Sequence, residues 1–288
     1  MITEHCEDAV VRRRADISCA SLLEMISAEG ETLKVSPTTE TRRVDGYVVK
    51  ACSRGSVFGV LKRTLRRNRY RRGWVAGLYL EQQGIGAPRV EGLVEKGRWG
   101  FISGSYLIME YLDGANNVER YLAEMVQDGA PEERIRTFLG GLAQTVNALR
   151  EAGAFHRDLS GKNIFTRKGE KFYFIDLDSI VPVKRYSRGM HYTNHVQLYD
   201  SFCDALGDVL LVPFLQKMLP PESDPRTWMP RVREGQRERR MRIEAKWDKQ
   251  GVRPRRIRDE LTDLDRDMRR ARGHLRDAES YLDCLRMR

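Results

Sequence analysis

The chain has 288 residues, of which 41% are hydrophobic and 32% charged, and its formal net charge is +10. This length and mixture predict a globular protein with a buried core and exclude a wholly disordered chain. The excess of positive charge indicates an anionic partner, and composition alone leaves nucleic acid, an acidic membrane surface and a phosphorylated substrate open.

Several classes of protein are disfavoured by simple patterns. The longest apolar run, residues 209–215, is far shorter than the roughly 20 residues of a membrane-spanning helix and contains Pro213. The N-terminus is acidic where a secretory signal is basic, so we expect a cytoplasmic protein. Five widely spaced cysteines include no C-x-x-C pair, which predicts reduced thiols rather than a disulfide framework or a zinc site.

The first part of the chain predicts a sheet with one helix. A weakly amphipathic segment at 19–28 predicts an N-terminal helix, and a second helix is expected over 74–83, ending at Gly84. Asp45-Gly46 is a strong hairpin signal. Short β-rich runs predict strands at 32–35, 41–44, 47–51, 90–94 and 106–110. We therefore expect a five-stranded antiparallel sheet.

The next part is mainly helical. A long helix begins near Pro131, with acidic residues in its first turn, and ends at Gly153, and its apolar residues recur at three and four positions. Two short strands are expected after it, at 163–166 and 172–175. Other helices are predicted at 118–126, 194–206 and 208–219.

The character of the chain changes at Pro220. Four prolines between 220 and 230 indicate a linker, and the rest reads as an arginine-rich helical tail. Residues 231–288 contain 19 Lys and Arg against 12 Asp and Glu, so most of the excess positive charge lies there. An intermittent apolar stripe in this tail is equally compatible with partner docking and with a solvent-exposed helix: Ile257, Leu261, Leu264, Met268, Leu275 and Leu282.

The motif that carries chemistry is His-Arg-Asp-Leu-Ser-Gly-Lys-Asn at 156–163, followed by a strand that ends in Ile175-Asp176. Phosphoryl transfer requires a group that orients and deprotonates the nucleophile and oxygen ligands for Mg²⁺. The spacing predicts Asp158 as the base, with Asn163 and Asp176 as metal ligands. One His-Arg-Asp could arise by chance, but three features in this order favour ATP-dependent phosphoryl transfer.

Other side chains are assigned around this motif. Lys50 ends an apolar strand, where an ammonium is costly unless it faces phosphate or a carboxylate, so we assign it to the α- and β-phosphates of ATP. Glu110 and Leu112 follow another apolar strand, where main-chain groups of a hinge would bind adenine. Lys162 is predicted to help neutralise the transferred phosphoryl group. A plain structural role is favoured for Asp178, and a second metal or a nearby arginine are the other partners considered.

These motifs resemble the lipopolysaccharide core kinases, which phosphorylate heptose or Kdo sugars and have a protein-kinase-like fold. The resemblance spans about residues 31–210 and adds to the motif the segments 47–50, 61–74, 83–88, 106–110, 172–178 and 197–202. It implies an α+β bilobal fold, with a five-stranded antiparallel sheet and one helix in the N-terminal lobe and a mainly helical C-terminal lobe. It also implies ATP and Mg²⁺ as cofactors. By position, it makes Asp158 the base, Asn163 and Asp176 the metal ligands, and Lys50 the lysine that binds ATP.

On this basis we predict four parts of the chain: an N-terminal extension at 1–30, a kinase N-lobe at 31–112, a kinase C-lobe at 113–220 and a basic helical extension at 221–288. His156 and Arg157 are expected to brace the loop rather than to react.

Two departures from the general kinase pattern stand out. No G-x-G-x-x-G motif lies between the first strands, so phosphate contacts in the loop 36–40 would use backbone N–H groups or Ser and Thr hydroxyls. The glutamate that usually pairs with the lysine is also missing, because the aligned position falls on Gly73 or Trp74. Glu81 could substitute, although a solvated helix residue is the commoner role for such a side chain.

The segment after Asp176 indicates the kind of acceptor. Only about seventeen residues lead to the next helix and they contain no Ala-Pro-Glu segment, so a small or lipid-linked hydroxyl acceptor fits better than a peptide. The family resemblance implies that this acceptor is a lipid-linked or anionic glycan. Seven cations in residues 61–72 and the basic tail could attract an anionic membrane at about 1 kcal/mol per charge. No aromatic platform accompanies them, which disfavours nucleic acid.

We therefore expect a cytoplasmic kinase, peripheral at the inner face of the inner membrane. A protein serine/threonine kinase and a catalytically inactive kinase fold that acts as a binding module are the alternatives.

Overall fold

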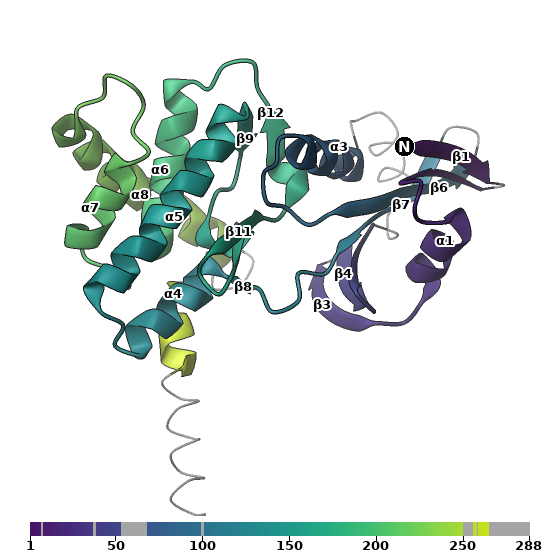
Figure 1. The fold of residues 1–288 in the computed structure, drawn as a ribbon, viewed down its shortest axis with the longest axis horizontal. Coiled ribbons are helices and arrows are strands. Elements are labelled where there is room, and N and C mark those ends of the chain that lie inside the picture. Colours follow the sequence, from purple (N-terminus) through teal and green to yellow (C-terminus); the bar gives the residue numbers. More distant parts are fainter. Residues whose placement is uncertain are drawn as a thin grey trace, which may run out of the picture. The chain divides into compact units, whose positions relative to one another are not determined.

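The computed structural model describes residues 1–6, 8–36, 39–52, 68–98, 101–249, 256–257 and 259–264. The chain divides into two compact units (Figure 1). The first unit contains 1–115, 145–158 and 171–187, and the second contains 116–144, 159–170 and 188–288.

The first unit is built on a seven-stranded antiparallel sheet. Its strands, in the order in which they pair, are β1 (Ile2–Cys6), β2 (Ala9–Arg13), β6 (Val90–Arg98), β7 (Phe101–Glu110), β5 (Tyr47–Cys52), β4 (Thr39–Val44) and β3 (Glu31–Ser36). The predicted meander is present as β3, β4 and β5.

The prediction of five strands is wrong, because β1 and β2 add to the edge at β6. Val11 of β2 is fully buried opposite Val94. This strand was not predicted, because the run Arg12–Arg14 resembles a charged, solvent-exposed segment. In the structure Arg12 donates to Glu95 at 2.6 Å and Arg13 pairs with Glu4, so these charges are accommodated within a β-sheet.

Two helices cover opposite faces of this sheet. Helix α1 (Cys19–Ser27) buries Leu22 in a cluster with Val49 and Ile108. Helix α3 (Arg69–Gln82) lies on the other face, where it meets Leu107, the neighbour of Ile108 along β7. Because directly paired residues share a face and Lys50 pairs with Leu107, Lys50 is on the face that α3 covers.

Helix α3 approaches the sheet through glycines. A Cβ at Gly73 would lie 2.8 Å from Leu107 Cδ2, and one at Gly77 would lie 2.5 Å from Val90 Cγ1 and 3.1 Å from Leu177 Cδ1. Leu177 begins the short 3-10 turn η2 (Leu177–Ser179), so the glycines bring α3 close to both the sheet and this turn.

The N-terminus of α3 also differs from prediction. Asn68 caps the helix by accepting from the Tyr70 N–H, so the helix begins five residues before the predicted start at 74 and includes the end of the basic tract. Residues 61–67 of that tract lie outside the described residues.

The first unit is completed by β11 (Lys171–Phe174) and by the antiparallel pair of β9 (Ala154–His156) with β12 (Ile180–Pro182). The Phe174 N–H donates to the Gly86 carbonyl at 2.8 Å. These segments flank the predicted catalytic motif.

The second unit is mainly helical, which agrees with the predicted α+β class. It contains α4 (Val118–Gln127), the start of α5 (Glu132–Glu151), η1 (Gly161–Asn163), α6 (Arg188–Phe202), α7 (Asp208–Gln216) and α8 (Pro225–Asp248), with β8 (Asn116–Asn117) paired to β10 (Ile164–Arg167). Pro230, interpreted as linker in the sequence, lies within α8. Trp228 and Val232 of α8 are buried.

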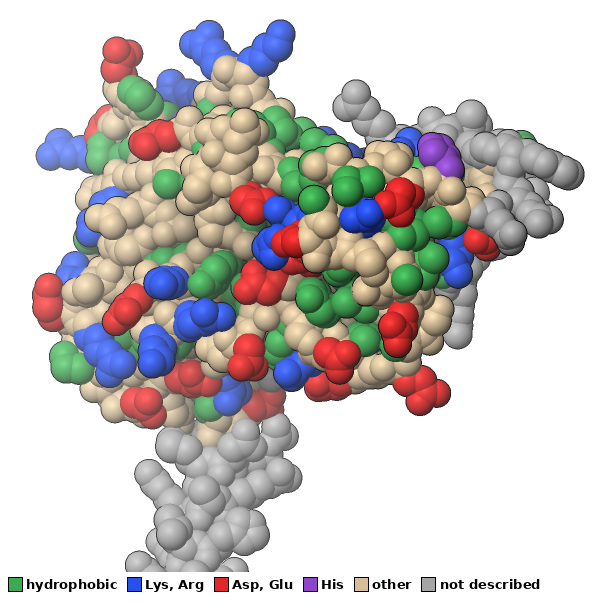
Figure 2. Space-filling model, turned by 45° about the vertical axis from the view of Figure 1, so that its right-hand side comes forward, with side chains coloured by type: hydrophobic (Ala, Val, Ile, Leu, Met, Phe, Trp, Pro, Cys, Tyr) green, Lys and Arg blue, Asp and Glu red, His purple; other side chains and the backbone are tan. Residues whose placement is uncertain are grey.

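The surface that can be described shows no concentration of one sign of charge on the face in Figure 2, where basic and acidic side chains are interspersed. Nearly all of the excess positive charge in the sequence belongs to residues outside the described ranges. Within the described part of the chain, no helix is both long and apolar enough to span a bilayer. The division into two extensions and two lobes stays a prediction.

The glycine seam of α3 yields a test of the fold. Gly77→Ala should destabilise the protein by about 1–2 kcal/mol, because overpacking against the stiff Val90 side chain exceeds the gain in helix propensity. Gly140→Ala is the matched control, since a Cβ there meets only the flexible end of Lys217 at 3.2 Å. It should be neutral or stabilising in chemical denaturation. Equal destabilisation by both variants would contradict the close approach of α3.

Candidate active site

Lys50 and Asp176 meet in the first unit. The Lys50 Nζ lies 3.4 Å from Asp176 Oδ1, and the Ser179 hydroxyl donates to Asp176 Oδ2 at 2.6 Å. Asp176 has φ 58° and ψ 50°, a left-handed conformation that is uncommon for residues other than glycine. The chain therefore turns sharply at Asp176, and both of its carboxylate oxygens have polar partners.

The charge state of Asp176 follows from these contacts. Burial by itself raises the pKa of the carboxyl, but the Lys50 ammonium and the Ser179 hydrogen bond outweigh burial and hold the pKa at about 2. Asp176 is therefore ionised at neutral pH. An ionised carboxylate is the ligand type that Mg²⁺ requires, so this residue fits the predicted metal role.

Asp178 has an arginine partner. The Nε and Nη2 atoms of Arg69, the first residue of α3, each lie 2.8 Å from Asp178 Oδ2. Burial and the nearby charge of Asp176 raise the pKa of Asp178, while Lys50 and Arg69 oppose this shift. The arginine considered as a partner of Asp178 is thus present as Arg69.

His156 connects the two segments of the motif. Its buried ring has Nε2 3.0 Å from the Ile175 carbonyl oxygen and Nδ1 3.2 Å from the Asp158 amide nitrogen. These partners assign a neutral ring that donates from Nε2 and accepts at Nδ1. Burial lowers the pKa of His156, which keeps the ring neutral. His156 therefore braces Asp158 and does not act as a base.

The predicted adenine-binding segment ends β7. The Glu110 N–H donates to the Arg89 carbonyl and the Tyr111 N–H donates to the Gly46 carbonyl, both at 2.8 Å. In the described part of the chain no hydrogen bond occupies the Leu112 N–H, so this donor is compatible with a contact to adenine.

Glu81 does not pair with Lys50, because its carboxylate pairs with Arg14. The candidate phosphate loop 36–40 includes residues 37 and 38, which lie outside the described residues.

In the second unit, side chains of α6 bind backbone N–H groups of the loop at 159–163. The Leu159 N–H donates to Gln197 Oε1 at 2.8 Å, and the Gly161 N–H donates to Ser201 Oγ at 2.9 Å. Asn163 is fixed within η1 by a bond from its N–H to the Ser160 carbonyl at 2.9 Å. Gln197 and Ser201, four residues apart on α6, thus accept two backbone N–H groups of this loop.

Lys162 lies beside a buried carboxyl. Its Nζ is 3.9 Å from Oε2 of Glu119, a residue in the first turn of α4. Burial raises the pKa of Glu119 to about 7, against the opposing effects of Lys162 and Ser201. A Cβ at Gly161 would lie 2.6 Å from Glu119 Cγ, so only glycine fits there.

Sequence reasoning missed Glu119, Arg69 and Ser179 as parts of the site. Glu119 reads as an ordinary acidic residue in a first helical turn, and Arg69 belonged to a tract interpreted as a membrane-binding surface. Ser179 had a weak signal, because it follows Asp176 by three residues, as in a side chain that caps a turn.

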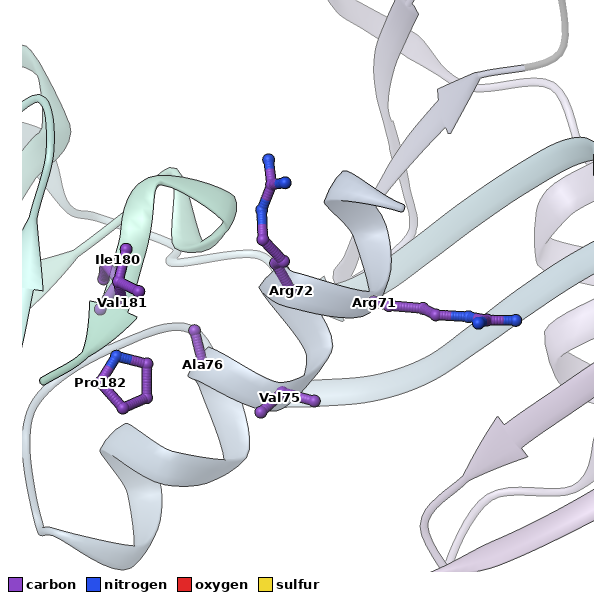
Figure 3. A pocket seen from close by; sticks show the side chains of 7 residues that line it. All are labelled: Arg71, Arg72, Val75, Ala76, Ile180, Val181 and Pro182. Carbon is purple, nitrogen blue, oxygen red and sulfur yellow. The ribbon is translucent and has the colours of Figure 1, made fainter. Parts of the chain in front are cut away.

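A cavity of about 420 Å³ lies beside α3 and β12 in the first unit (Figure 3). Its walls are formed by Arg71, Arg72, Val75, Ala76, Ile180, Val181 and Pro182. No predicted site residue lines it, and it contains no carboxylate, so we do not assign phosphoryl transfer to this cavity.

An antiparallel sheet carrying Lys50, a buried His156 that fixes the Asp158 backbone and an ionised Asp176 at the end of a strand are the features of a protein-kinase-like phosphotransferase. Comparison with known proteins agrees. The model of the lipopolysaccharide kinase (Kdo/WaaP) family matches residues 27–206, which is more than half of the chain. The chain belongs to this family and is an ATP-dependent lipopolysaccharide kinase.

The fold is shared with a solved structure of WaaP. A structure of WaaP in complex with acyl carrier protein shares 18% identity, covers 76% of this chain and 90% of that chain, and has a TM-score of 0.56. Two structures of WbdD, one described as a bifunctional kinase-methyltransferase, share 17% and 18% identity. They cover 70% and 69% of this chain and 49% and 47% of theirs, with TM-scores of 0.43 and 0.42. No curated protein matches the chain.

The buried Glu119 gives a pH test. Its folded-state pKa of about 7 exceeds the ordinary value of 4.5, so its stabilising contribution is complete below pH 4.5 and is lost as the pH rises through 7. Relative to Glu119→Gln, the wild type should lose about 3 kcal/mol of unfolding free energy over this range.

Denaturant unfolding of both proteins between pH 4.5 and pH 8 measures this difference. Glu124→Gln is the control, because Glu124 is on the same helix and its side chain is 33% exposed. Parallel stability curves for wild type and Glu119→Gln would show that the carboxyl is not desolvated.

Proposed function

We propose that this kinase transfers the γ-phosphate of ATP to a sugar hydroxyl, on heptose or Kdo, of the lipopolysaccharide core. The observation that carries the proposal is the ionised Asp176, paired with Lys50 at 3.4 Å, beside an Asp158 backbone that His156 fixes to the Ile175 carbonyl. This combination supplies a base, a metal ligand and a phosphate-binding cation from residues that are far apart in the sequence.

Asp158 orients the acceptor hydroxyl and takes its proton. The hydroxyl oxygen then forms a bond to the γ-phosphorus as the bond to the β–γ bridging oxygen breaks, which leaves ADP and a phosphorylated sugar. A bound Mg²⁺ would offset negative charge on the phosphates. Asp176 and Asn163 are the residues proposed to hold that ion, both with oxygen ligands.

Lys50 is proposed to exchange partners when nucleotide binds. Its side chain is 22% exposed in the pair with Asp176, so the ammonium remains accessible to α- and β-phosphate oxygens. Glu110 and Leu112 are proposed to bind adenine through main-chain groups.

Lys162 is proposed to offset charge on the transferred phosphoryl group. Because the pKa of Glu119 is about 7, that carboxyl does not fully cancel the Lys162 ammonium at neutral pH.

A membrane-bound acceptor fits an enzyme that docks at the cytoplasmic face of the inner membrane. In the described half of the basic tract, Arg69 pairs with Asp178 and Arg71 pairs with Glu95 at 2.8 Å. Contact with anionic lipid is therefore proposed for residues 61–67 and for the end of the tail, which lie outside the described residues.

The assignment of the base is tested by Asp158→Ala. Its rate of phosphate transfer from Mg·ATP to dephosphorylated core oligosaccharide should fall about 10²–10⁴-fold, the usual contribution of a general base, while ATP affinity changes little. Asp128→Asn, at the end of α4, should keep full activity. Residual activity of Asp158→Ala within tenfold of wild type would rule out Asp158 as the base, and phosphate appearing only on protein would rule out the sugar acceptor.

Nucleotide binding tests the role of Lys50. Lys50→Met should weaken ATP binding about 10–100-fold, since a hydrogen bond to a charged group is worth about 1.5–3 kcal/mol. Titration calorimetry with Mg·ATP measures this change, and Lys34→Met on β3 is the control for loss of one strand lysine. Unchanged affinity in Lys50→Met would place the phosphates away from β5.

A further inference from the structure

Helix α6 has two sets of partners in the second unit. Gln197 and Ser201 accept the N–H groups of Leu159 and Gly161 in the catalytic loop. Asp200 lies next to Ser201 and has its partners in the C-terminal extension, defined here as α8 together with residues 256–257 and 259–264.

The carboxylate of Asp200 has three hydrogen-bond donors and one further ion-pair partner, Arg239, in this extension. Arg240 Nε lies 2.6 Å and Gln236 Nε2 3.2 Å from Asp200 Oδ1, and Arg239 Nε lies 3.3 Å from Oδ2. Arg256 Nη1 is 3.4 Å from Oδ1. The Asp200 side chain is only 12% exposed, so these pairs are largely shielded from solvent.

Arg240 extends the contact along α6. Its Nη1 lies 2.8 Å from Asp204 Oδ1, and its Nη2 lies 3.3 Å from the Asp200 carbonyl oxygen and 3.2 Å from Cys203 Sγ. One guanidinium therefore binds both Asp200 and Asp204, which are four residues apart in the sequence. Such forked geometry fixes orientation as well as charge.

The extension also contacts α4, whose residue Glu119 packs against the loop at 159–163. Glu260 lies 3.6 Å from Arg120 on α4, next to Glu119, the carboxyl that touches Gly161 and Lys162. Ile257 is 1% exposed. The extension is thus packed at Ile257 and ion-paired at Glu260, although the sequence was compatible with a solvent-exposed helix.

We propose that Asp200 is a positioning residue through which the C-terminal extension holds α6, and thereby the Leu159 and Gly161 amides, in the geometry that transfer requires. The inference rests on the proposed function. Residues 225–264 lie beyond the segment that matches the family model, which ends at residue 206, so this support is an addition to the matched kinase region.

Breaking a shielded pair while leaving the other charge in place is costly, so loss of the Arg240 guanidinium should loosen α6 around Asp200. The effect should pass to Gln197 and Ser201, because they belong to the same rigid helix. ATP binding should change little, since Lys50 and Leu112 belong to the first unit.

The experiment compares Arg240→Met with Arg233→Met in the full chain. Arg233 is on the same helix and pairs with Asp208 at 2.7 Å, and Asp208 accepts a hydrogen bond from Tyr199 of α6. The Arg233 and Asp208 side chains are 37% and 47% exposed, so loss of this surface pair should disturb α6 little. Hydrogen exchange, resolved to peptides that contain Leu159 and Gly161, is the readout independent of activity.

Arg240→Met should speed exchange of these amides about tenfold and lower kcat about tenfold, with KM for ATP within twofold of wild type. Arg233→Met should change none of these quantities. Unchanged exchange in Arg240→Met, or an equal change in both variants, would overturn the inference and leave only general stabilisation by the extension.

Two milder variants cover the case in which Arg240→Met does not fold. Arg240→Lys keeps the charge but loses the fork, and Asp200→Asn keeps the size of the acceptor. Both should show intermediate exchange at Leu159 and Gly161, and exchange at the wild-type rate in both would refute the proposal. If exchange responds but no variant, wild type included, phosphorylates the core oligosaccharide, the proposed acceptor fails while the mechanical link stands.

Discussion

The arrangement of the site depends on one buried imidazole. His156 donates to the Ile175 carbonyl and accepts the Asp158 N–H, so it ties the loop at Asp158 to the strand end that precedes Asp176. Separating these segments would leave buried polar groups unpaired, at a cost of about 1–3 kcal/mol each. Protonation would remove the acceptor at Nδ1, and burial opposes it. The backbone contacts of His156 therefore help to set the positions of Asp158 and Asp176.

In the general kinase pattern, a glutamate on the helix after the lysine strand pairs with that lysine. Helix α3 has no such glutamate and contacts the site in another way. Here Gly73 and Gly77 allow the helix to lie close to the sheet and to η2, where a larger residue would clash. The helix reaches the site by Arg69, which binds Asp178, and the carboxylate partner of Lys50 is Asp176. As a consequence, the lysine proposed to bind phosphate is paired with the residue proposed to bind the metal. Binding of Mg·ATP would supply both with new partners at once, which links the two binding events.

The parts of this architecture that could be predicted from the sequence are those encoded locally. The β3–β4–β5 meander followed from β-branched runs and the Asp45-Gly46 turn, and the catalytic motif is contiguous. Contacts between distant residues left no local signal. Cys6 and Cys19 have their sulfurs 3.3 Å apart although their spacing matches no motif, and Glu119 is buried against Gly161 by tertiary packing alone. Strand β2 was missed because its arginines resemble a charged tail until their partners Glu4 and Glu95 are known.

Because contacts between distant residues leave no local signal, the net charge of the sequence must also be interpreted differently. A charge of +10 predicted an anionic partner, yet many arginines of the described chain neutralise the protein's own carboxylates: Arg69 binds Asp178, Arg71 binds Glu95 and Arg240 binds Asp200. Arginine suits this role because its planar fork binds two acceptors in a defined orientation and stays charged when partly buried. Composition counts these structural arginines together with any that bind a partner. Among the described residues, Arg69 and Arg240 therefore serve the protein's own structure, by fixing Asp178 in the first unit and Asp200 in the second.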